Sequence, residues 1–198
     1  MNKISETNEH LAPIFQEVLP ALTNGGVKYF VFGGVGIAGL AGKFFRENED
    51  VDVYVAEEDF SKTESILRTL CEEHGDWDAD GWTLLYSRLK TTRRPKLDLY
   101  IKGVQLFSVV PVYRTSQGVE FRVLRAFVLP ENALNQKPRS ISGLEFFSPP
   151  DDILQLLLKN LLESYTERKK PVEEYTKYLL DARMVLPEEE LHKYMTTA

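Results

Sequence analysis

The chain has 198 residues, of which 43% are hydrophobic and 27% are charged, a composition typical of a soluble globular protein. Its formal net charge of −6 argues against broad non-specific binding to nucleic acids. The single cysteine, Cys71, excludes an internal disulfide, and no segment approaches the roughly 20 apolar residues needed to span a membrane. With no long apolar segment at the N-terminus, the sequence predicts a cytoplasmic enzyme or binding module without a membrane partner.

The first part of the chain alternates helix and strand. Hydrophobic spacing predicts helices over 10–26, 35–45 and 61–75, and strands over 27–34 and 50–57. Gly25 and Gly26 form a helix stop after the first helix. For the third helix, Ser61 and Glu64 have the spacing of a capping box and Gly75 is the expected stop.

From residue 81 onward the pattern changes to consecutive strands and then to helices. Strands are expected over 82–89, 96–102, 108–114, 120–129 and 144–148, and helices over 152–165, over 172–183 and from Pro187. The turn before Val119 predicts a hairpin. Ser148 is a candidate cap, Pro149 suits a first helical position, and Asp151 and Asp152 complement the helix dipole. We therefore expect an α/β (α+β) mixed sheet with flanking helices in residues 1–148 and a helical C-terminal segment in residues 149–198.

The glycines after the first strand allow two interpretations. Gly34, Gly36 and Gly39 fit G-x-G-x-x-G, the dinucleotide-binding fingerprint of a Rossmann fold that binds NAD, and Glu57 or Glu58 could then contact the ribose. A Rossmann domain, however, keeps alternating strand and helix, whereas this chain changes to adjacent strands. A Gly-Gly turn between a strand and a helix is also found in other enzymes that handle phosphates.

Three aspartates favour the second interpretation. Asp50 and Asp52 are two residues apart at the start of a strand, so both carboxylates face the same side. Aspartate is disfavoured in strands, and a divalent cation such as Mg²⁺ supplies a reason for two on one face. Asp98 lies between Leu97 and Leu99 in another strand. If the two strands are neighbours, the three acids could hold two metal ions for phosphoryl or nucleotidyl transfer.

This pattern resembles the DNA polymerase beta-like nucleotidyltransferase superfamily, whose signature is a Gly-Gly or Gly-Ser turn, Asp-x-Asp on the next strand and a third Asp later. It is most similar to the small bacterial branch with R-x-T-x-D-x-D, which includes AbiEii-type toxin transferases and lincosamide and aminoglycoside nucleotidyltransferases. Arg46, Asp50 and Asp52 occupy the matching places, and Asn48 replaces the usual Thr. Residues 147–151 and Lys159 resemble the later S-P-x-D motif and its helix.

The resemblance implies a nucleotidyltransferase fold and a Mg²⁺-dependent transfer of a nucleoside monophosphate from a nucleoside triphosphate to a hydroxyl acceptor. Asp50 and Asp52 would hold two Mg²⁺ ions, and Asp98 would complete the second site and take the proton of the acceptor. The phosphates would lie over Gly33 and Gly34. Arg46 and Lys159 would offset their charge.

The acceptor implied by the resemblance is RNA such as tRNA, a protein, or an antibiotic-like small molecule, and a cognate antitoxin is a candidate partner. A second reading is a catalytically inactive nucleotide- or partner-binding module on the same fold, because "ERKKPVEE" has Pro171 where the AbiEii-like group has Asp. The basic residues near Asp98 are interpreted as a solvated face; they are Lys90, Arg93, Arg94, Lys96 and Lys102.

Overall fold

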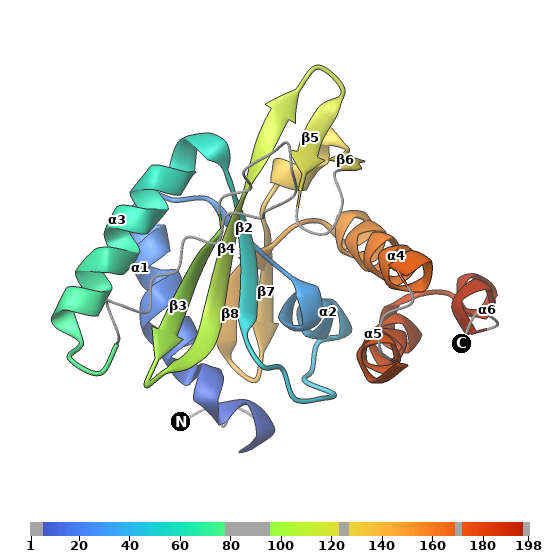
Figure 1. Ribbon diagram of the computed structural model, residues 1–198, viewed down its shortest axis with the longest axis horizontal. Coiled ribbons are helices and arrows are strands. Elements are labelled where there is room, and N and C mark those ends of the chain that lie inside the picture. Colours follow the sequence, from blue (N-terminus) through green and yellow to red (C-terminus); the bar gives the residue numbers. More distant parts are fainter. Residues whose placement is uncertain (1–5, 78–95, 123–126, 169–171, 196–198) are drawn as a thin grey trace.

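A computed structural model of the chain describes residues 6–77, 96–122, 127–168 and 172–195 (Figure 1). Its centre is a sheet with the strand order β1-β2-β4-β5-β6, in which β3 also pairs with β4. The strands are β1 (Tyr29–Phe32), β2 (Val51–Ala56), β3 (Leu97–Ile101), β4 (Val104–Thr115), β5 (Gly118–Phe121) and β6 (Phe127–Leu129). β2 and β4 are parallel and the other pairs are antiparallel, so the predicted mixed sheet is confirmed.

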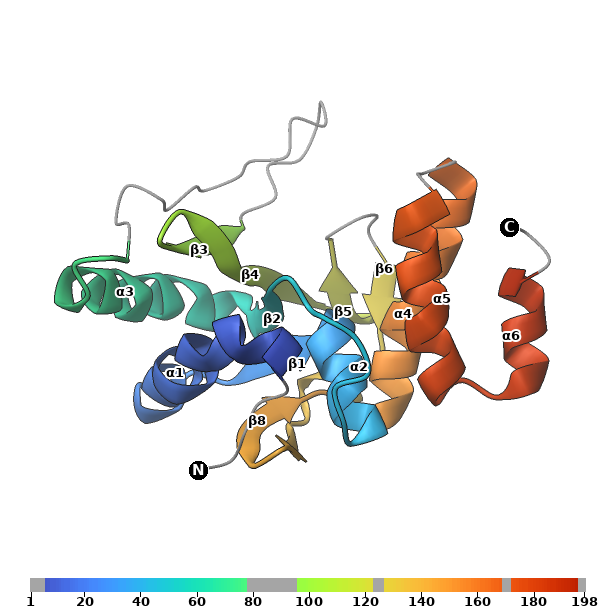
Figure 2. The same cartoon turned by 90° about the horizontal axis from the view of Figure 1, so that it is seen from below.

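Helices cover both faces of this sheet (Figures 1 and 2). The N-terminal helical segment and α3 lie on one side, and α2 and the C-terminal helices lie on the other. A separate two-stranded sheet packs Phe147 against Tyr29 of β1. The bounds of these elements are η1 (Glu6–Leu11), η2 (Ile14–Val18), α1 (Leu19–Asn24), α2 (Gly33–Ala41), α3 (Glu57–Glu73), η4 (Glu131–Leu134), β7 (Lys137–Ile141), β8 (Leu144–Ser148), α4 (Asp151–Arg168), α5 (Val172–Val185) and α6 (Glu188–Met195).

The alternation of side chains along β2 directs its polar residues to one side of the sheet. Val51, Val53 and Val55 are buried in the hydrophobic core that includes α1 and α3. Tyr54 faces the opposite side, where it packs in a second core with residues of α4. Because side chains two residues apart share a face, Asp52 also points to the α4 side. The acid therefore lies on the face that the C-terminal helices cover.

Three local predictions are wrong, and each has a physical reason. α3 begins at Glu57, directly after β2, so Ser61 and Glu64 lie inside the helix and form no capping box. Three acidic residues at its start complement the helix dipole instead. Ser148 does not cap α4, because its hydroxyl donates to the carbonyl oxygen of Pro149 and accepts a hydrogen bond from Arg139 Nε. Gly75 follows a helix that has already ended at Glu73.

The strand predictions differ from the structure at the second half of the sheet. The single strand expected over 120–129 is two antiparallel strands, β5 and β6, since the chain reverses between Phe121 and Phe127. β7 was not predicted, and the strand expected over 82–89 lies outside the described residues. The hairpin before Val119 is confirmed, with Thr115 paired to Gly118.

The C-terminal helices predicted after Ser148 are present and form one hydrophobic cluster with α2. Leu154 and Leu158 of α4 and Tyr175 of α5 are buried together with Ile37 of α2. Asp151 and Asp152 occupy the first turn of α4, as expected. In the described part of the chain no helix is both long and apolar enough to cross a membrane.

Candidate active site

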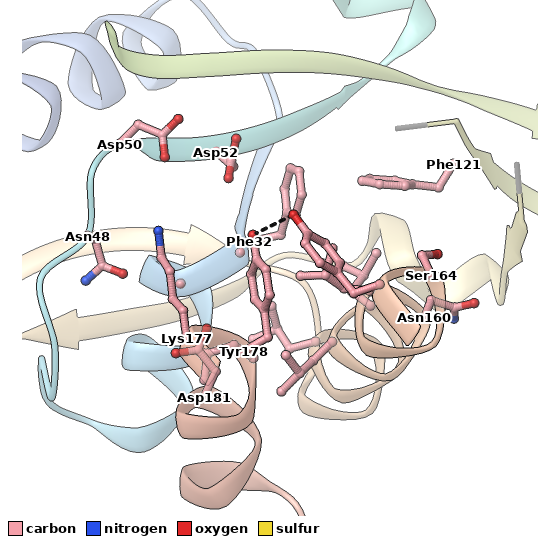
Figure 3. Close-up of a pocket in the computed structure, with 18 of the residues that line it drawn as sticks. Phe32, Asn48, Asp50, Asp52, Phe121, Asn160, Ser164, Lys177, Tyr178 and Asp181 are labelled. Atoms are coloured by element: carbon pink, nitrogen blue, oxygen red, sulfur yellow. Dashed lines mark hydrogen bonds between the residues drawn. The ribbon is translucent and has the colours of Figure 1, made fainter. Parts of the chain in front are cut away.

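A pocket of about 310 Å³ lies between the sheet, the start of α2 and the helices α4 and α5 (Figure 3). One end is polar and is lined by Gly33, Gly34, Arg46, Asn48, Glu49, Asp50, Asp52, Lys96, Lys177 and Asp181. The other end is mainly apolar and is lined by Phe32, Ile37, Val110, Phe121, Phe127, Leu154, Leu157, Leu158, Leu161, Tyr165 and Tyr178, together with Asn160 and Ser164. Such a pocket suits a ligand with a charged part and an apolar part.

Asp50 and Asp52 both line the polar end, as Figure 3 shows. Asp52 belongs to β2, and Asp50 precedes that strand. Burial is the main cause that raises the pKa of both carboxyl groups; the negative charge of Asp50 adds to this and raises the pKa of Asp52 to about 7. Two close acids whose charge is not fully compensated are a favourable environment for a divalent cation.

Asp98 lies on the same sheet, on β3, which is separated from β2 by β4. Ser108 of β4 pairs in register with Asp52 on one side and with Asp98 on the other. Asp98 is fully buried; its Oδ1 accepts a hydrogen bond from Ser108 Oγ at 2.6 Å and forms an ion pair with Lys96 Nζ at 2.9 Å. Its Oδ2 has no hydrogen-bond partner in the described part of the chain.

The strands that carry Asp52 and Asp98 are not neighbours, because β4 lies between β2 and β3, and the three predicted acids are not equally placed. Asp98 does not line the pocket, and Ser108 stands between it and Asp52. Across residues 6–77, 96–122, 127–168 and 172–195, no three His, Cys, Asp or Glu side chains are grouped closely enough to hold a metal ion. The raised pKa of Asp52 and the unpartnered Oδ2 of Asp98 nevertheless fit a cation, which would neutralise the buried charge.

The absence of side chains at Gly33 and Gly34 allows other residues to pack closely at the polar end of the pocket. Gly33 has a φ of +63°, which favours glycine, and a Cβ atom there would lie 2.9 Å from Asp52 Oδ2. A Cβ atom on Gly34 would lie 2.2 Å from Arg46 Nη2 and 2.3 Å from Asn48 Oδ1. The missing side chain of Gly34 thus leaves room for Arg46 and Asn48, whereas the resemblance implied that phosphates would lie there.

Arg46 and Lys177 bring two cations to the polar end, each paired with an acid. Arg46 donates to both carboxylate oxygens of Asp181 in α5, and Lys177 Nζ donates to Glu49 Oε1 at 2.9 Å. These two contacts connect the loop before β2 to α5. The loop is held from the other side by Asn8, whose Oδ1 accepts a hydrogen bond from the Asn48 backbone N–H.

Lys159 does not line the pocket, which corrects its expected position. Its ammonium group forms an ion pair with Glu190 of α6. Lys177 takes the corresponding place on α5, and Figure 3 shows its side chain directed toward Asn48 and Asp50. The available signal was the i, i+4 spacing of Lys177 and Asp181, which puts both on one face of a helix. Lys96, interpreted as part of a solvated face, also lines the polar end.

Aromatic side chains form much of the apolar end and come from segments far apart in the sequence. The rings of Tyr165 in α4 and Tyr178 in α5 have centroids 4.9 Å apart. Phe32 of β1 packs edge-on against Phe121 of β5, with centroids 5.2 Å apart. Aromatic faces of this kind can stack on a planar ligand group such as a nucleobase.

Comparisons with known proteins agree with this geometry. A family model for aminoglycoside-2''-adenylyltransferase matches residues 14–94, and no curated protein matches the sequence. The crystal structure of ANT(2'')-Ia in complex with adenylyl-2''-tobramycin is similar with a TM-score of 0.61 at 14% identity, covering 96% of this chain and 96% of that chain. The solution structure of ANT(2'')-Ia gives 0.60 at 14% identity, covering 95% and 90%. A putative nucleotidyltransferase from Thermotoga maritima gives 0.54 at 16% identity, covering 81% and 92%.

The chain has a fold similar to that of these nucleotidyltransferases, as its Gly-Gly turn and Asp-x-Asp pattern predict. Among these proteins it resembles the aminoglycoside transferases, through the family match over residues 14–94 and the similar fold. The Rossmann alternative is wrong, because β1 and β2 are antiparallel, whereas the first two strands of a Rossmann fold are parallel.

Proposed function

We propose that this protein is a Mg²⁺-dependent nucleotidyltransferase that moves a nucleoside monophosphate from a nucleoside triphosphate to a hydroxyl group of a small-molecule acceptor. The observation that carries the proposal is the register of the sheet, in which Asp52, Ser108 and Asp98 are neighbours across three strands. Asp50 adds a carboxylate at the same end of β2. The family match with aminoglycoside-2''-adenylyltransferase supports both the reaction and the class of acceptor.

The residues that would hold Mg²⁺ are Asp50 and Asp52, with Asp98 completing the site. The bound ion would offset the negative charge on the phosphates and on the leaving pyrophosphate. Asp98 would take the proton of the acceptor hydroxyl at Oδ2, the oxygen that has no partner among the described residues, while the acceptor oxygen bonds to the α-phosphorus and the bond to pyrophosphate breaks.

Cations of this chain would bind the triphosphate by exchanging partners. Lys177 is paired with Glu49 and Arg46 with Asp181 at the polar end of the pocket. Phosphate oxygens, like carboxylates, accept charge-assisted hydrogen bonds from guanidinium and ammonium groups, so they are suitable alternative partners for both cations. The aromatic rings of Tyr165, Tyr178 and Phe121 would contact the nucleobase or the apolar part of the acceptor.

The test is incubation with each of the four α-labelled ribonucleoside triphosphates and three acceptor fractions. The fractions are small molecules, including tobramycin and a lincosamide, then total RNA, then protein. We expect label in the small-molecule fraction, release of pyrophosphate, and loss of both in EDTA or in the double variant Asp50→Asn, Asp52→Asn.

Each other outcome overturns a stated part of the proposal. Label in RNA or protein would exclude the small-molecule acceptor and favour the tRNA or protein acceptors that the sequence also allows. Triphosphate binding without pyrophosphate release in any fraction would favour the inactive binding module. A cognate antitoxin stays a prediction from the sequence resemblance, which co-purification from the native host would test.

A further inference from the structure

A chain of hydrogen bonds links two of the three acids through residues that the sequence did not single out. Gln105 Nε2 donates to Asp50 Oδ2 at 3.1 Å and to Ser108 Oγ at 2.8 Å. Ser108 Oγ in turn donates to Asp98 Oδ1 at 2.6 Å. The direction is fixed at both ends, since an ionised carboxylate only accepts hydrogen bonds. The amide of Gln105 therefore contacts Asp50 directly and is linked to Asp98 through the hydroxyl group of Ser108.

Gln105 reaches this face because of an irregularity in β4. β3 and β4 pair Leu99 with Phe107 and then Tyr100 with Gln105, so Leu106 is an extra residue on β4. In a regular strand Gln105, three positions before Ser108, would face the opposite side. Leu106 and Phe107 are both buried in the core on the α3 side, as expected for the two residues of a β-bulge. The bulge turns Gln105 back toward the acids.

The network also determines which carboxylate oxygens stay available. Ser108 and Lys96 both contact Oδ1 of Asp98, which leaves Oδ2 without a partner in the described part of the chain. Gln105 contacts Oδ2 of Asp50, so Oδ1 of Asp50 is the oxygen left for another contact. Groups that orient ligating carboxylates in this way commonly change metal affinity or activity by 10- to 100-fold when they are removed.

We infer that Gln105 and Ser108 are positioning residues that hold Asp50 and Asp98 in one arrangement, and that the β4 bulge at Leu106 exists to place Gln105 there. The inference rests on the proposed function, because the orientation matters only if the acids hold a metal ion and act on an acceptor. Gln105 and Ser108 act through the acids and make no contact of their own with the reacting atoms.

The test compares Gln105→Met, Ser108→Ala and the double variant with the wild type. Met keeps the length of the side chain and removes both N–H donors. Gln117→Met is the matched control, since Gln117 lies in the exposed turn between β4 and β5 and does not line the pocket. The readouts are the Mn²⁺ dissociation constant from electron paramagnetic resonance titration, the Mg²⁺ dependence of transfer, and the melting temperature with and without Mn²⁺.

We expect each single variant to raise the Mn²⁺ dissociation constant by roughly 10-fold, and the double variant to raise it no further than the worse single variant, because the two residues belong to one network. The control should match the wild type. An unchanged Mn²⁺ affinity in folded Gln105→Met, or additive effects in the double variant, would overturn the inference and leave the proposed function standing. A wild-type protein that binds no Mn²⁺ and transfers no nucleotide would overturn both.

Discussion

Arg46, on the loop before β2, forms a bidentate ion pair with Asp181 of α5, 135 residues further along the chain, with Nε to Oδ1 and Nη2 to Oδ2 distances of 2.6 and 2.8 Å. The side chain of Asp181 is 1% exposed and that of Arg46 is 12% exposed, so the pair is largely removed from water. It connects the loop that carries Asn48 and Asp50 to the C-terminal helices, and both partners line the pocket.

Removal of the charge at Asp181 should therefore be costly. Asp181→Asn leaves the Arg46 guanidinium buried without its anion, and we expect the free energy of unfolding in urea to fall by about 3 kcal/mol. The control is Arg68→Ala, which breaks an exposed i, i+4 pair with Glu64 and should change stability by less than about 0.5 kcal/mol. Equal stability of the two variants would contradict the buried-pair account.

Gly34→Ala should damage the polar end of the pocket. The added Cβ atom would meet Arg46 Nη2 and Asn48 Oδ1 at 2.2 and 2.3 Å, so both side chains must move. We expect a loss of about 1–3 kcal/mol in stability and weaker triphosphate binding by calorimetry. Gly75→Ala is the control, because among the described residues no atom other than those of its chain neighbours lies within 4 Å of its added Cβ. Wild-type affinity and stability in Gly34→Ala would show that the site tolerates the shift.

Lys177, and not Lys159, should contribute to triphosphate binding. Lys177→Ala removes an ammonium group from the polar end, and we expect the triphosphate dissociation constant to rise by roughly 10-fold, the scale of one hydrogen bond to a charged group. Lys159→Ala removes the same group from a helix surface where it pairs with Glu190, and the dissociation constant should stay within about twofold of the wild type. The reverse order of the two effects would restore the assignment made from sequence.

The stability of the metal-free protein should fall as the pH rises toward 7. The pKa of Asp52 is raised from 3.8 to about 7 in the folded state, so between these values the folded protein keeps a proton that the unfolded chain has released. The free energy of unfolding then decreases with pH, and the decrease is complete above the folded-state pKa.

Asp52→Asn removes this contribution. In EDTA we expect the variant to be more stable than the wild type at pH 8 and similar to it at pH 4, as measured by urea unfolding. Added Mg²⁺ should stabilise only the wild type at pH 8. A wild type that gains stability relative to the variant between pH 4 and pH 7 would contradict the raised pKa.

Asp98→Asn should separate binding from transfer. Asp50 and Asp52 line the pocket and stay unchanged, so they should still bind one Mg²⁺–triphosphate complex through the triphosphate oxygens, although the metal affinity of the protein alone should fall with the loss of Asp98. Loss of the oxygen that takes the acceptor proton should lower the rate of transfer by on the order of 10²-fold or more. Single-turnover transfer and calorimetry measure the two properties. Transfer at the wild-type rate would remove Asp98 from the mechanism.

Local patterns in the sequence were sufficient to predict the main elements and the common side of Asp50 and Asp52, both of which line the pocket. The alternation of valine and aspartate in residues 50–55 determines that Asp52 faces away from the valines, because side chains in a strand alternate between faces. The Gly33-Gly34 turn is equally local, since a φ of +63° at Gly33 favours glycine whatever packs around it. These features depend only on neighbours in the chain.

Tertiary structure decided the residues that complete the site. Lys177 and Asp181 meet the loop at Arg46 and Glu49 only because α5 packs on α2, a contact that no spacing in the sequence encodes. The neighbourhood of Asp98 depends on strand register, and the orientation of Gln105 depends on one extra residue in β4. Long-range packing and register arise from the summed burial of many side chains, so the helix pattern that led to Lys159 could not show that Lys177 of the next helix would face the pocket.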